Sequence, residues 1–341
     1  MRELIVDKGS ECQRLNKYLG KYLDAAPQSF IYKMLRKKNI KYNGVRAAGD
    51  ELLKSGDIIQ IFMSDDTISN FQSSVTSINE TCENEEPLKD IQILYEDKDI
   101  IILNKPAGVL SQKARPDDYS LNEQIIDHYY QRDEIDDHFT PSVCNRLDRN
   151  TSGIILGGMS YQGTRILSKM LKERTLTKYY LTIVKGSIDK PRTIKGYLTK
   201  NEAHNRVVIY SDIDEAKKAG IDNPAYIETR YIPLGHGKVS DGRREYTLTL
   251  LKVELVTGKT HQIRAHLKSI GNPIIGDGKY GHKDINAYFR KEYGLKHQLL
   301  HAYEIIFPDN NETLSGELSG KIIVAKLPAI FENIKDDLII Q

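Results

Sequence analysis

The chain has 341 residues, enough for two or three domains, and 39% of them are hydrophobic. Lys and Arg number 49 against 47 Asp and Glu, so the formal net charge is only +2 and any strongly basic surface must be local. Cys12, Cys82 and Cys144 are widely separated, which argues against a disulfide framework or a structural zinc site. The sequence shows neither a signal peptide nor an apolar run near the roughly 20 residues that span a bilayer. We therefore expect a soluble, cytoplasmic protein without a membrane partner.

Residues 1–63 form the first block. Apolar side chains at helical spacing predict helices around 15–23 and 31–35, and the residues at 27–29 separate them. Asn43-Gly44 predicts a turn after a short strand over 39–42, and isoleucines predict another strand over 58–61. The block therefore reads as a small α/β domain.

Residues 64–90 differ in composition. They are polar, with seven acidic side chains and one basic side chain, and few large apolar residues. Such a segment cannot bury enough apolar surface to offset the entropy that it loses on ordering. We predict a flexible acidic linker.

From 91 to 335, strand and helix patterns mix. We predict paired strands over 91–95 and 100–103, further strands over 179–184 and 246–256, and helices over 164–174 and 260–270. Because strands and helices do not alternate regularly, we predict an α+β fold with a mixed, mostly antiparallel sheet.

The N-terminal block is locally basic. It holds 12 Lys and Arg against 7 Asp and Glu, a net charge of +5. Five of the cations cluster around the end of the second predicted helix: Lys33, Arg36, Lys37, Lys38 and Lys41. Cations there complement the helix dipole, and they are also suited to contact phosphates. The charge alone leaves both interpretations open.

Three motifs follow in order in this block: RLNKYL at 14–19, LRKKNIKYNG at 35–44 and GDII at 56–59. Together they resemble the S4 RNA-binding domain. The resemblance implies that a positive helix face docks on structured RNA, with Arg36, Lys37 and Lys38 among the contacts.

One carboxylate stands out in the larger block. Asp148 lies between Arg146 and Arg149 and is followed by Thr-Ser-Gly and an apolar run typical of a buried strand. Flanking arginines favour the ionised form of a carboxylate. An aspartate in such a loop also commonly caps a turn or pairs with arginine, so spacing alone leaves a structural role open.

Four segments agree in order and spacing with one family. They are NKPAG at 104–108, RLDRNTSG at 146–153, TGKTHQIRAH at 257–266, and LHA at 300–302 followed by Ile306-Phe307. Together they resemble the pseudouridine synthases of the RluA type, with Asn145 and Lys259 where that family commonly has histidine and arginine. The resemblance implies a pseudouridine synthase fold over 91–335 and an enzyme that isomerises uridine in structured RNA.

The resemblance also implies roles. Asp148 matches the essential aspartate, Arg264 the basic residue that pairs with it, and Tyr180 the tyrosine that stacks on the target base. Tyr179 is the alternative register. Further RNA-binding candidates are Arg146, Asn145, Lys105, Lys259, His261 and Gln262. For His261, Gln262 and His266, fixing the loop is an equally open role. Neither histidine has the neighbours of a metal site.

The implied reaction breaks the N1–C1′ bond of uridine, turns the uracil and rejoins it through C5. The target must be swung out into a pocket. As an isomerisation it needs no cofactor and no metal. Asp148 has three possible roles: attack on C1′, stabilisation of the oxocarbenium charge, or removal of the C2′ proton to give a glycal. The family reading gives Tyr180 the removal of the C5 proton.

The expected substrate is 23S ribosomal RNA, with transfer RNA as the alternative, and the expected state is a monomer. We interpret 201–245 and 282–298 as insertions that tune substrate choice. A catalytically inactive RNA-binding or ribosome-assembly protein is a second possibility, although Asp148 and Arg264 are both intact. A sugar hydrolase is disfavoured because it needs two acidic residues.

Overall fold

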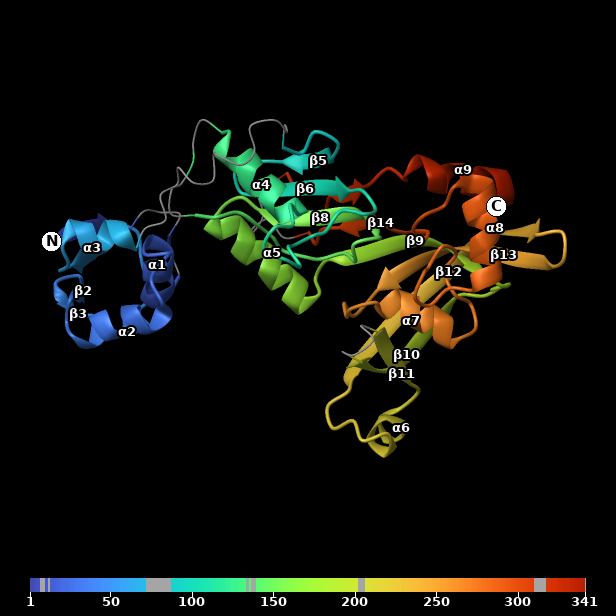
Figure 1. Cartoon of the computed structure of the whole chain (residues 1–341), viewed down its shortest axis with the longest axis horizontal. Helices are drawn as coiled ribbons and strands as arrows, with labels where there is room; N and C mark the ends of the chain where they lie inside the picture. Colours follow the sequence, from blue (N-terminus) through green and yellow to red (C-terminus); the bar gives the residue numbers. More distant parts are fainter. Residues whose placement is uncertain are drawn as a thin grey trace.

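The computed structural model describes residues 1–6, 10–11, 13–71, 87–132, 135, 139–201, 206–309 and 317–340. They form a smaller unit up to residue 71 and a larger unit from 87 onward, arranged side by side along the long axis (Figure 1). Most of the predicted linker, 72–86, lies outside the described residues, as do Cys12 and Cys82. None of the helices in the described ranges combines the length and apolar composition needed to cross a membrane.

The smaller unit is a four-stranded antiparallel sheet with helices against it. The strand order is β1 (Arg2–Ile5), β4 (Ile58–Ile61), β2 (Ile40–Tyr42), β3 (Val45–Arg46). The helices are α1 (Leu15–Tyr22), α2 (Gln28–Arg36) and α3 (Asp65–Asn70). Asn43 and Gly44, with φ of 49° and 78°, make the predicted tight turn between β2 and β3.

Helix α3 lies where the sequence predicted linker. The side chain of Ser64 accepts a hydrogen bond from the Thr67 amide and caps the helix, and Ile68 is buried in the apolar core of the smaller unit. Asp65 and Asp66, which suggested a linker, occupy the first turn, where carboxylates favour the helix dipole. Ordered structure therefore continues past the predicted boundary at 63.

The larger unit is built on an 11-stranded sheet. Its main path runs β11 (Arg206–Tyr210), β10 (Arg192–Asn201), β12 (Ala225–Ser240), β13 (Glu245–Leu255), β9 (Thr177–Lys185), β14 (Leu300–Ile306), β8 (Ser152–Gly158), β6 (Ile100–Lys105), β5 (Gln92–Glu96). Strand β15 (Ile322–Val324) pairs with β14, and β7 (Ser142–Val143) pairs with β8. Among these described strands only β14 and β8 pair in parallel, which confirms the predicted mixed, mostly antiparallel sheet.

Helices alternate with these strands along the larger unit. They are α4 (Leu121–Tyr130), α5 (Tyr161–Glu173), α6 (Ile213–Lys218), α7 (Gln262–Ser269), α8 (Lys283–Tyr293) and α9 (Ala329–Leu338). Most of the segments interpreted as insertions are part of this framework. Strand β12 lies between β10 and β13, and α8 buries Ile285 and Phe289 in the apolar core. The interpretation of 201–245 and 282–298 as insertions that tune substrate choice stays a prediction.

Strands β8 and β14 approach each other closely at Gly153. Its φ is 112°, and a Cβ placed there would lie 2.2 Å from the carbonyl oxygen of Ala302. Only glycine fits this backbone conformation and this spacing. The residue directly after the Thr-Ser pair thus fixes how the loop before β8 meets the centre of the sheet.

Lys21 of α1 links the two units. Its Nζ donates a hydrogen bond to the hydroxyl of Tyr161 at 2.6 Å and lies 4.0 Å from the centroid of the Tyr161 ring. The same ammonium lies 5.9 Å from the ring centroid of Phe139. A cation over aromatic faces is an attractive contact, so Lys21 helps to set the position of the smaller unit.

Two fully buried histidines, His266 and His301, make stability depend on pH. His266 Nδ1 lies 2.9 Å from Thr229 Oγ1, and His301 Nδ1 lies 2.8 Å from Ser152 Oγ. Burial lowers the pKa of each imidazole from 6.5 to about 4. Between these values the unfolded chain binds protons that the folded chain does not, so stability is full above pH 6.5 and falls toward pH 4.

Lowering the pH from 7.5 to 5.5 is expected to cost about 1 kcal/mol of unfolding free energy per buried histidine. Denaturant titrations of wild type and His301→Gln at both pH values measure this, because the variant loses one histidine's share of the pH dependence. His236→Gln is the matched control, since the His236 side chain is 43% exposed. If the pH dependence of stability in His301→Gln equals that of wild type, His301 is not one of its causes.

Candidate active site

A cleft of about 800 Å³ opens on the larger unit. The loop before β8, the end of β13 and the start of α7 contribute to its walls. Among the described residues that line it, one is acidic, Asp148, and eight are basic: Lys113, Arg146, Lys172, Arg174, Lys178, Lys200, Lys259 and Arg264. A polyanion is the partner that such a wall favours.

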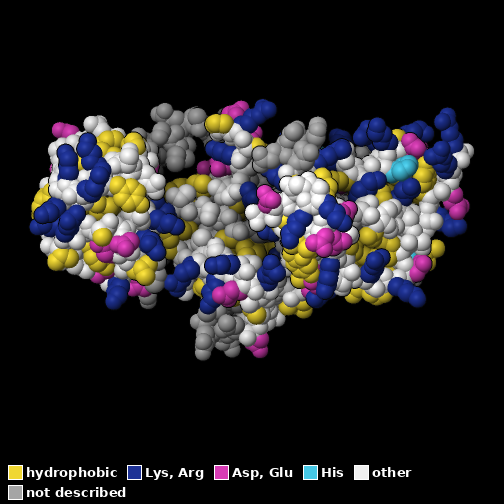
Figure 2. Space-filling model, turned by 90° about the horizontal axis from the view of Figure 1, so that it is seen from below, with side chains coloured by type: hydrophobic (Ala, Val, Ile, Leu, Met, Phe, Trp, Pro, Cys, Tyr) yellow, Lys and Arg dark blue, Asp and Glu magenta, His cyan; other side chains and the backbone are white. Residues whose placement is uncertain are grey.

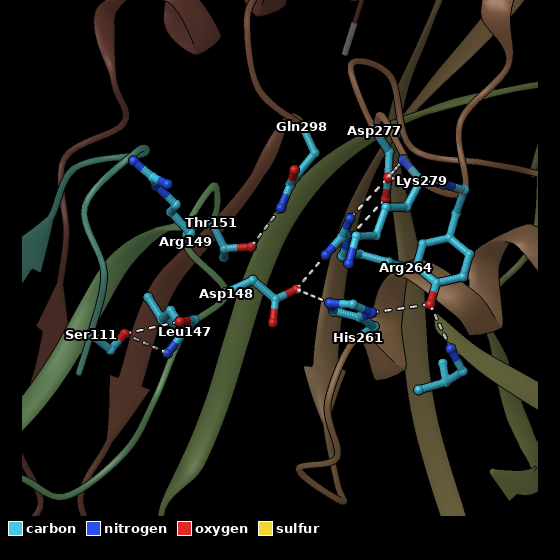
Figure 3. Close-up of polar contacts among 12 residues, drawn as sticks. Ser111, Leu147, Asp148, Arg149, Thr151, His261, Arg264, Asp277, Lys279 and Gln298 are labelled. Atoms are coloured by element: carbon cyan, nitrogen blue, oxygen red, sulfur yellow. Dashed lines mark hydrogen bonds and ion pairs between the residues drawn. The ribbon is translucent and has the colours of Figure 1, made fainter. Parts of the chain in front are cut away.

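Asp148 stands in this cleft with its side chain 25% exposed. Its Oδ2 accepts a hydrogen bond from Arg264 Nη1 at 2.6 Å and lies 3.9 Å from His261 Nε2 (Figure 3). The structure therefore brings together Asp148 and Arg264, which are 116 positions apart in the sequence. One carboxylate oxygen is held by these groups, which leaves the carboxylate partly open to the cleft.

The backbone around Asp148 is held on both sides. The Ser111 hydroxyl donates to the Leu147 carbonyl at 2.9 Å and accepts from the Leu147 amide at 3.1 Å. On the other side, the Thr151 amide donates to the Asp148 carbonyl, and Gln298 Nε2 donates to Thr151 Oγ1 at 3.0 Å. Hydrogen bonds thus fix the backbone on both sides of Asp148.

Arg264 of α7 is held by a residue that the sequence did not single out, Asp277. Arg264 Nε donates to Asp277 Oδ2 at 2.8 Å, and Nη2 donates to Oδ1 at 3.0 Å. Burial lowers the pKa of Arg264, but the hydrogen bonds and charges of Asp277 and Asp148 outweigh it and raise that pKa. Burial raises the pKa of Asp277, and Arg264 with two backbone amides brings it below its usual value. Both groups are therefore ionised near neutral pH.

His261 lies just before α7 with a left-handed φ of 54°. Its Nδ1 lies 3.0 Å from the hydroxyl of Tyr280, and its other nitrogen faces Asp148. Burial lowers the pKa of His261, more than the charge of Asp148 raises it. His261 thus lines the cleft and is also held in place by its neighbours, and an RNA contact by His261 stays a prediction.

Tyr180 on β9 is buried and lines the cleft. Tyr179 is absent from the lining of this cleft, because successive residues of a strand face opposite ways, and Lys252 Nζ lies 4.2 Å from its ring centroid. This placement favours Tyr180 over Tyr179 as the aromatic residue of the site. Burial, together with the charge of Asp148, raises the pKa of Tyr180 above its usual range.

Lys105 contradicts the sequence prediction that it contacts RNA. Its side chain is fully buried, and Nζ donates to the carbonyls of Pro106, Val109 and Arg149. Burial lowers its pKa to about 7. Lys105 thus ties the loop after β6 to the loop that carries Asp148. The sequence could not distinguish a phosphate-binding lysine from one that binds carbonyls inside the fold.

Gln262 lines the cleft, where an RNA contact was predicted, but its polar atoms are bonded inside the fold. It is buried, its Oε1 accepts from Thr257 Oγ1 and the Lys259 amide, and its Nε2 donates to Thr229 Oγ1 and the Glu228 carbonyl. All four of these bonds are internal, so Gln262 fixes the loop. Of the two roles left open, the structural one is observed.

Asn145 mainly serves the backbone. Its Oδ1 accepts from the Leu156 amide at 2.7 Å and its Nδ2 donates to the Ile154 carbonyl at 3.4 Å.

Arg146 and Lys259 are exposed at the cleft, as predicted for RNA contacts. Arg36, Lys37 and Lys38 are exposed around the end of α2 in the smaller unit and do not line the cleft. On the face of that unit that Figure 2 shows, Lys and Arg side chains predominate over Asp and Glu side chains.

Within the described ranges, no group of three or more His, Cys, Asp or Glu side chains is placed to hold a metal ion. The absence of a cofactor and of a metal remains a prediction from the chemistry of the reaction.

Comparisons with known proteins bear on this site. A model of the RNA pseudouridylate synthase family matches residues 99–269. Ribosomal large subunit pseudouridine synthase C of Haemophilus influenzae is 32% identical, covering 92% of this chain and 90% of that protein. The protein of that name from Pasteurella multocida is 31% identical, covering 92% and 89%. The solved structure of human RNA Pseudouridylate Synthase Domain Containing 1 has a TM-score of 0.50 and 23% identity, and the match covers 74% of this chain and 97% of that one.

The fold, the cleft and these matches define an isomerase that acts on RNA. The chain belongs to the RNA pseudouridylate synthase family, in its RluA-type branch. The human structure supports the pseudouridine synthase fold alone.

Proposed function

We propose that the enzyme isomerises specific uridines in 23S ribosomal RNA, as a cytoplasmic monomer. Asp148 carries the proposal: it is the acidic side chain of a basic cleft, and Arg264 holds it. The names of the Haemophilus and Pasteurella relatives, which refer to the large ribosomal subunit, support ribosomal RNA over transfer RNA.

The chemistry needs one carboxylate. The N1–C1′ bond breaks, a C5–C1′ bond forms, C5 loses its proton and N1 gains one, so no oxidant or co-reactant is consumed. The carboxylate of Asp148 can serve each possible first step: attack on C1′, stabilisation of an oxocarbenium charge, or removal of the C2′ proton. Arg264 holds that carboxylate in place, because its Nη1 donates a hydrogen bond to Oδ2 at 2.6 Å.

The experiment uses RNA that carries tritium at C5 of uracil. The purified enzyme should release tritium from ribosomal RNA, and mapping of the product should place pseudouridine at defined sites. Release from transfer RNA alone would replace the proposed substrate. Binding without release from either RNA would favour a ribosome-assembly role instead.

Tyr180 is proposed to stack on the target base and to take part in removal of the C5 proton. Its position in the cleft wall supports the first role. Because its raised pKa keeps the hydroxyl protonated at neutral pH, Tyr180 must give up its hydroxyl proton as it accepts the proton from C5, and N1 of the uracil, which gains one proton, balances this transfer.

Tyr180→Phe keeps the aromatic face and removes the hydroxyl. RNA affinity should stay within about threefold of wild type, while release of the C5 proton slows by about 100-fold or more. Single-turnover tritium release measures the rate, and Tyr179→Phe is the matched control. A fully active Tyr180→Phe would leave only the stacking role.

We propose that the smaller unit is an S4-like RNA-binding domain, joined through the linker to a catalytic domain from 91 to 335. Its separate apolar core supports the division, and the exposed cations Arg36, Lys37 and Lys38 support RNA binding. The hydrogen bond from Lys21 to Tyr161 joins the smaller unit to the larger one and helps to set its position.

Replacing Arg36, Lys37 and Lys38 together by Ala should weaken RNA binding and reduce its salt dependence by roughly one unit of slope for each phosphate that these cations neutralise. The rate of isomerisation on bound RNA should not change. The charge-matched control replaces three exposed cations of the larger unit: Lys238, Arg244 and Lys291. Equal reductions in both variants would indicate a general charge effect rather than a docking surface.

A further inference from the structure

We propose that Asp277 is a positioning residue for the reaction, which fixes the guanidinium of Arg264 so that one of its nitrogens stays on Asp148. The inference rests on the proposed catalytic role of Asp148. Asp277 does not line the cleft, so it acts through Arg264 and does not touch RNA.

The geometry of the guanidinium carries the argument. Asp277 holds the Nε and Nη2 edge in a two-pronged pair, at 2.8 and 3.0 Å, and the remaining nitrogen, Nη1, donates to Asp148 at 2.6 Å. Because the guanidinium is planar and rigid, fixing one edge fixes the direction of the third nitrogen. A lysine has no such fork and could not hold both carboxylates in this way.

Asp277 is itself rigidly held. Its Oδ1 also accepts from the amides of Lys279 and Tyr280, at 2.8 and 3.0 Å. Gly276 before it has a φ of 80°, and a Cβ there would lie 2.3 Å from the His297 carbonyl oxygen. These contacts fix the orientation of the carboxylate, and the carboxylate in turn fixes the orientation of the Arg264 guanidinium (Figure 3).

The same turn orients His261. The Val207 amide donates to the Tyr280 hydroxyl oxygen at 2.9 Å, and that hydroxyl lies 3.0 Å from His261 Nδ1. With Nδ1 on Tyr280, Nε2 of His261 faces Asp148 at 3.9 Å. The turn from Gly276 to Tyr280 thus places both groups that face the essential carboxylate.

Asp277→Asn is the direct test. An amide keeps the shape but offers one acceptor and one donor to two N–H groups of Arg264, so the guanidinium turns. We expect the single-turnover rate of tritium release to fall on the order of 100-fold, with KM and RNA affinity within about threefold of wild type. The matched control is Glu96→Gln, which breaks the partly buried pair of Glu96 with Arg132 away from the cleft and should leave the rate unchanged.

A double-mutant cycle with Arg264→Lys separates positioning from a structural role. If Asp277 acts through Arg264, adding Asp277→Asn to Arg264→Lys should slow the reaction by less than about threefold. If the rate reductions of the two single variants multiply in the double variant, the inference is overturned. A wild-type rate in Arg264→Lys would also overturn it, and this second outcome can be measured even if Asp277→Asn does not fold. An inactive Asp148→Asn with a fully active Asp277→Asn overturns this inference alone, whereas a fully active Asp148→Asn overturns the proposed function.

Discussion

Asp148→Asn is expected to reduce pseudouridine formation by about 10⁴-fold or more, the largest effect of any single change in the cleft. An amide neither attacks C1′ nor takes a proton nor balances a positive sugar. The fold should survive, because the amide oxygen can still accept from Arg264 and because Asp277 continues to pair with that guanidinium. Tritium release under single-turnover conditions measures the reduction.

The matched control is Asp189→Asn, because the Asp189 side chain is 75% exposed and does not line the cleft. RNA affinity of Asp148→Asn should remain within about tenfold of wild type, since the basic side chains of the cleft are unchanged. Equal tritium release by wild type and Asp148→Asn would show that another group is the essential carboxylate.

Gly153→Ala is expected to have the largest effect on stability. The new Cβ would meet the Ala302 carbonyl oxygen at 2.2 Å and the Ala302 nitrogen at 2.5 Å, and the φ of 112° is one that alanine rarely adopts. Backbone strain and steric overlap each cost on the order of 1–3 kcal/mol, so we expect a destabilisation of about 3 kcal/mol or more. Denaturant titration gives the change in unfolding free energy.

Gly258→Ala serves as the comparison, because a Cβ at Gly258 has no heavy atom within 4 Å and its φ is not in the left-handed region. Its unfolding free energy should lie within about 0.5 kcal/mol of wild type. If both alanine variants unfold at the same denaturant concentration, the packing between β8 and β14 is looser than the structure describes.

The sequence was informative about the site where residue types are fixed by chemistry. The motifs that contain Asp148 and Arg264 predicted that the two residues pair, and the structure places Arg264 Nη1 2.6 Å from Asp148 Oδ2. Asp277 was missed because an aspartate between two glycines also reads as an ordinary turn. Lys105 and Gln262 were placed at the RNA because a sequence does not show which polar side chains are turned inward.

For the fold, periodicity identified α1, α5, β9 and β13 to within a few residues. It failed on β12, where Pro233, Gly235 and Gly237 interrupt the pattern and a register shift occurs between Pro233 and Gly235. It also failed on α3, since a short acidic helix has the composition of a linker. In both cases tertiary packing outweighs the local signal.

The position of β14 in the sheet determines when, during translation, the sheet can be completed. This strand pairs with β8 on one side and β9 on the other, so it joins β5, β6 and β8 to the strands from β9 to β11. It is formed by residues 300–306, which follow Asp148, Arg264 and Asp277 in the chain. Domains fold as units during synthesis, and long-range pairing is slow. The nascent chain therefore holds Asp148, Arg264 and Asp277 for some time before the sheet that aligns them is closed, and it becomes an enzyme only after β14 has been translated.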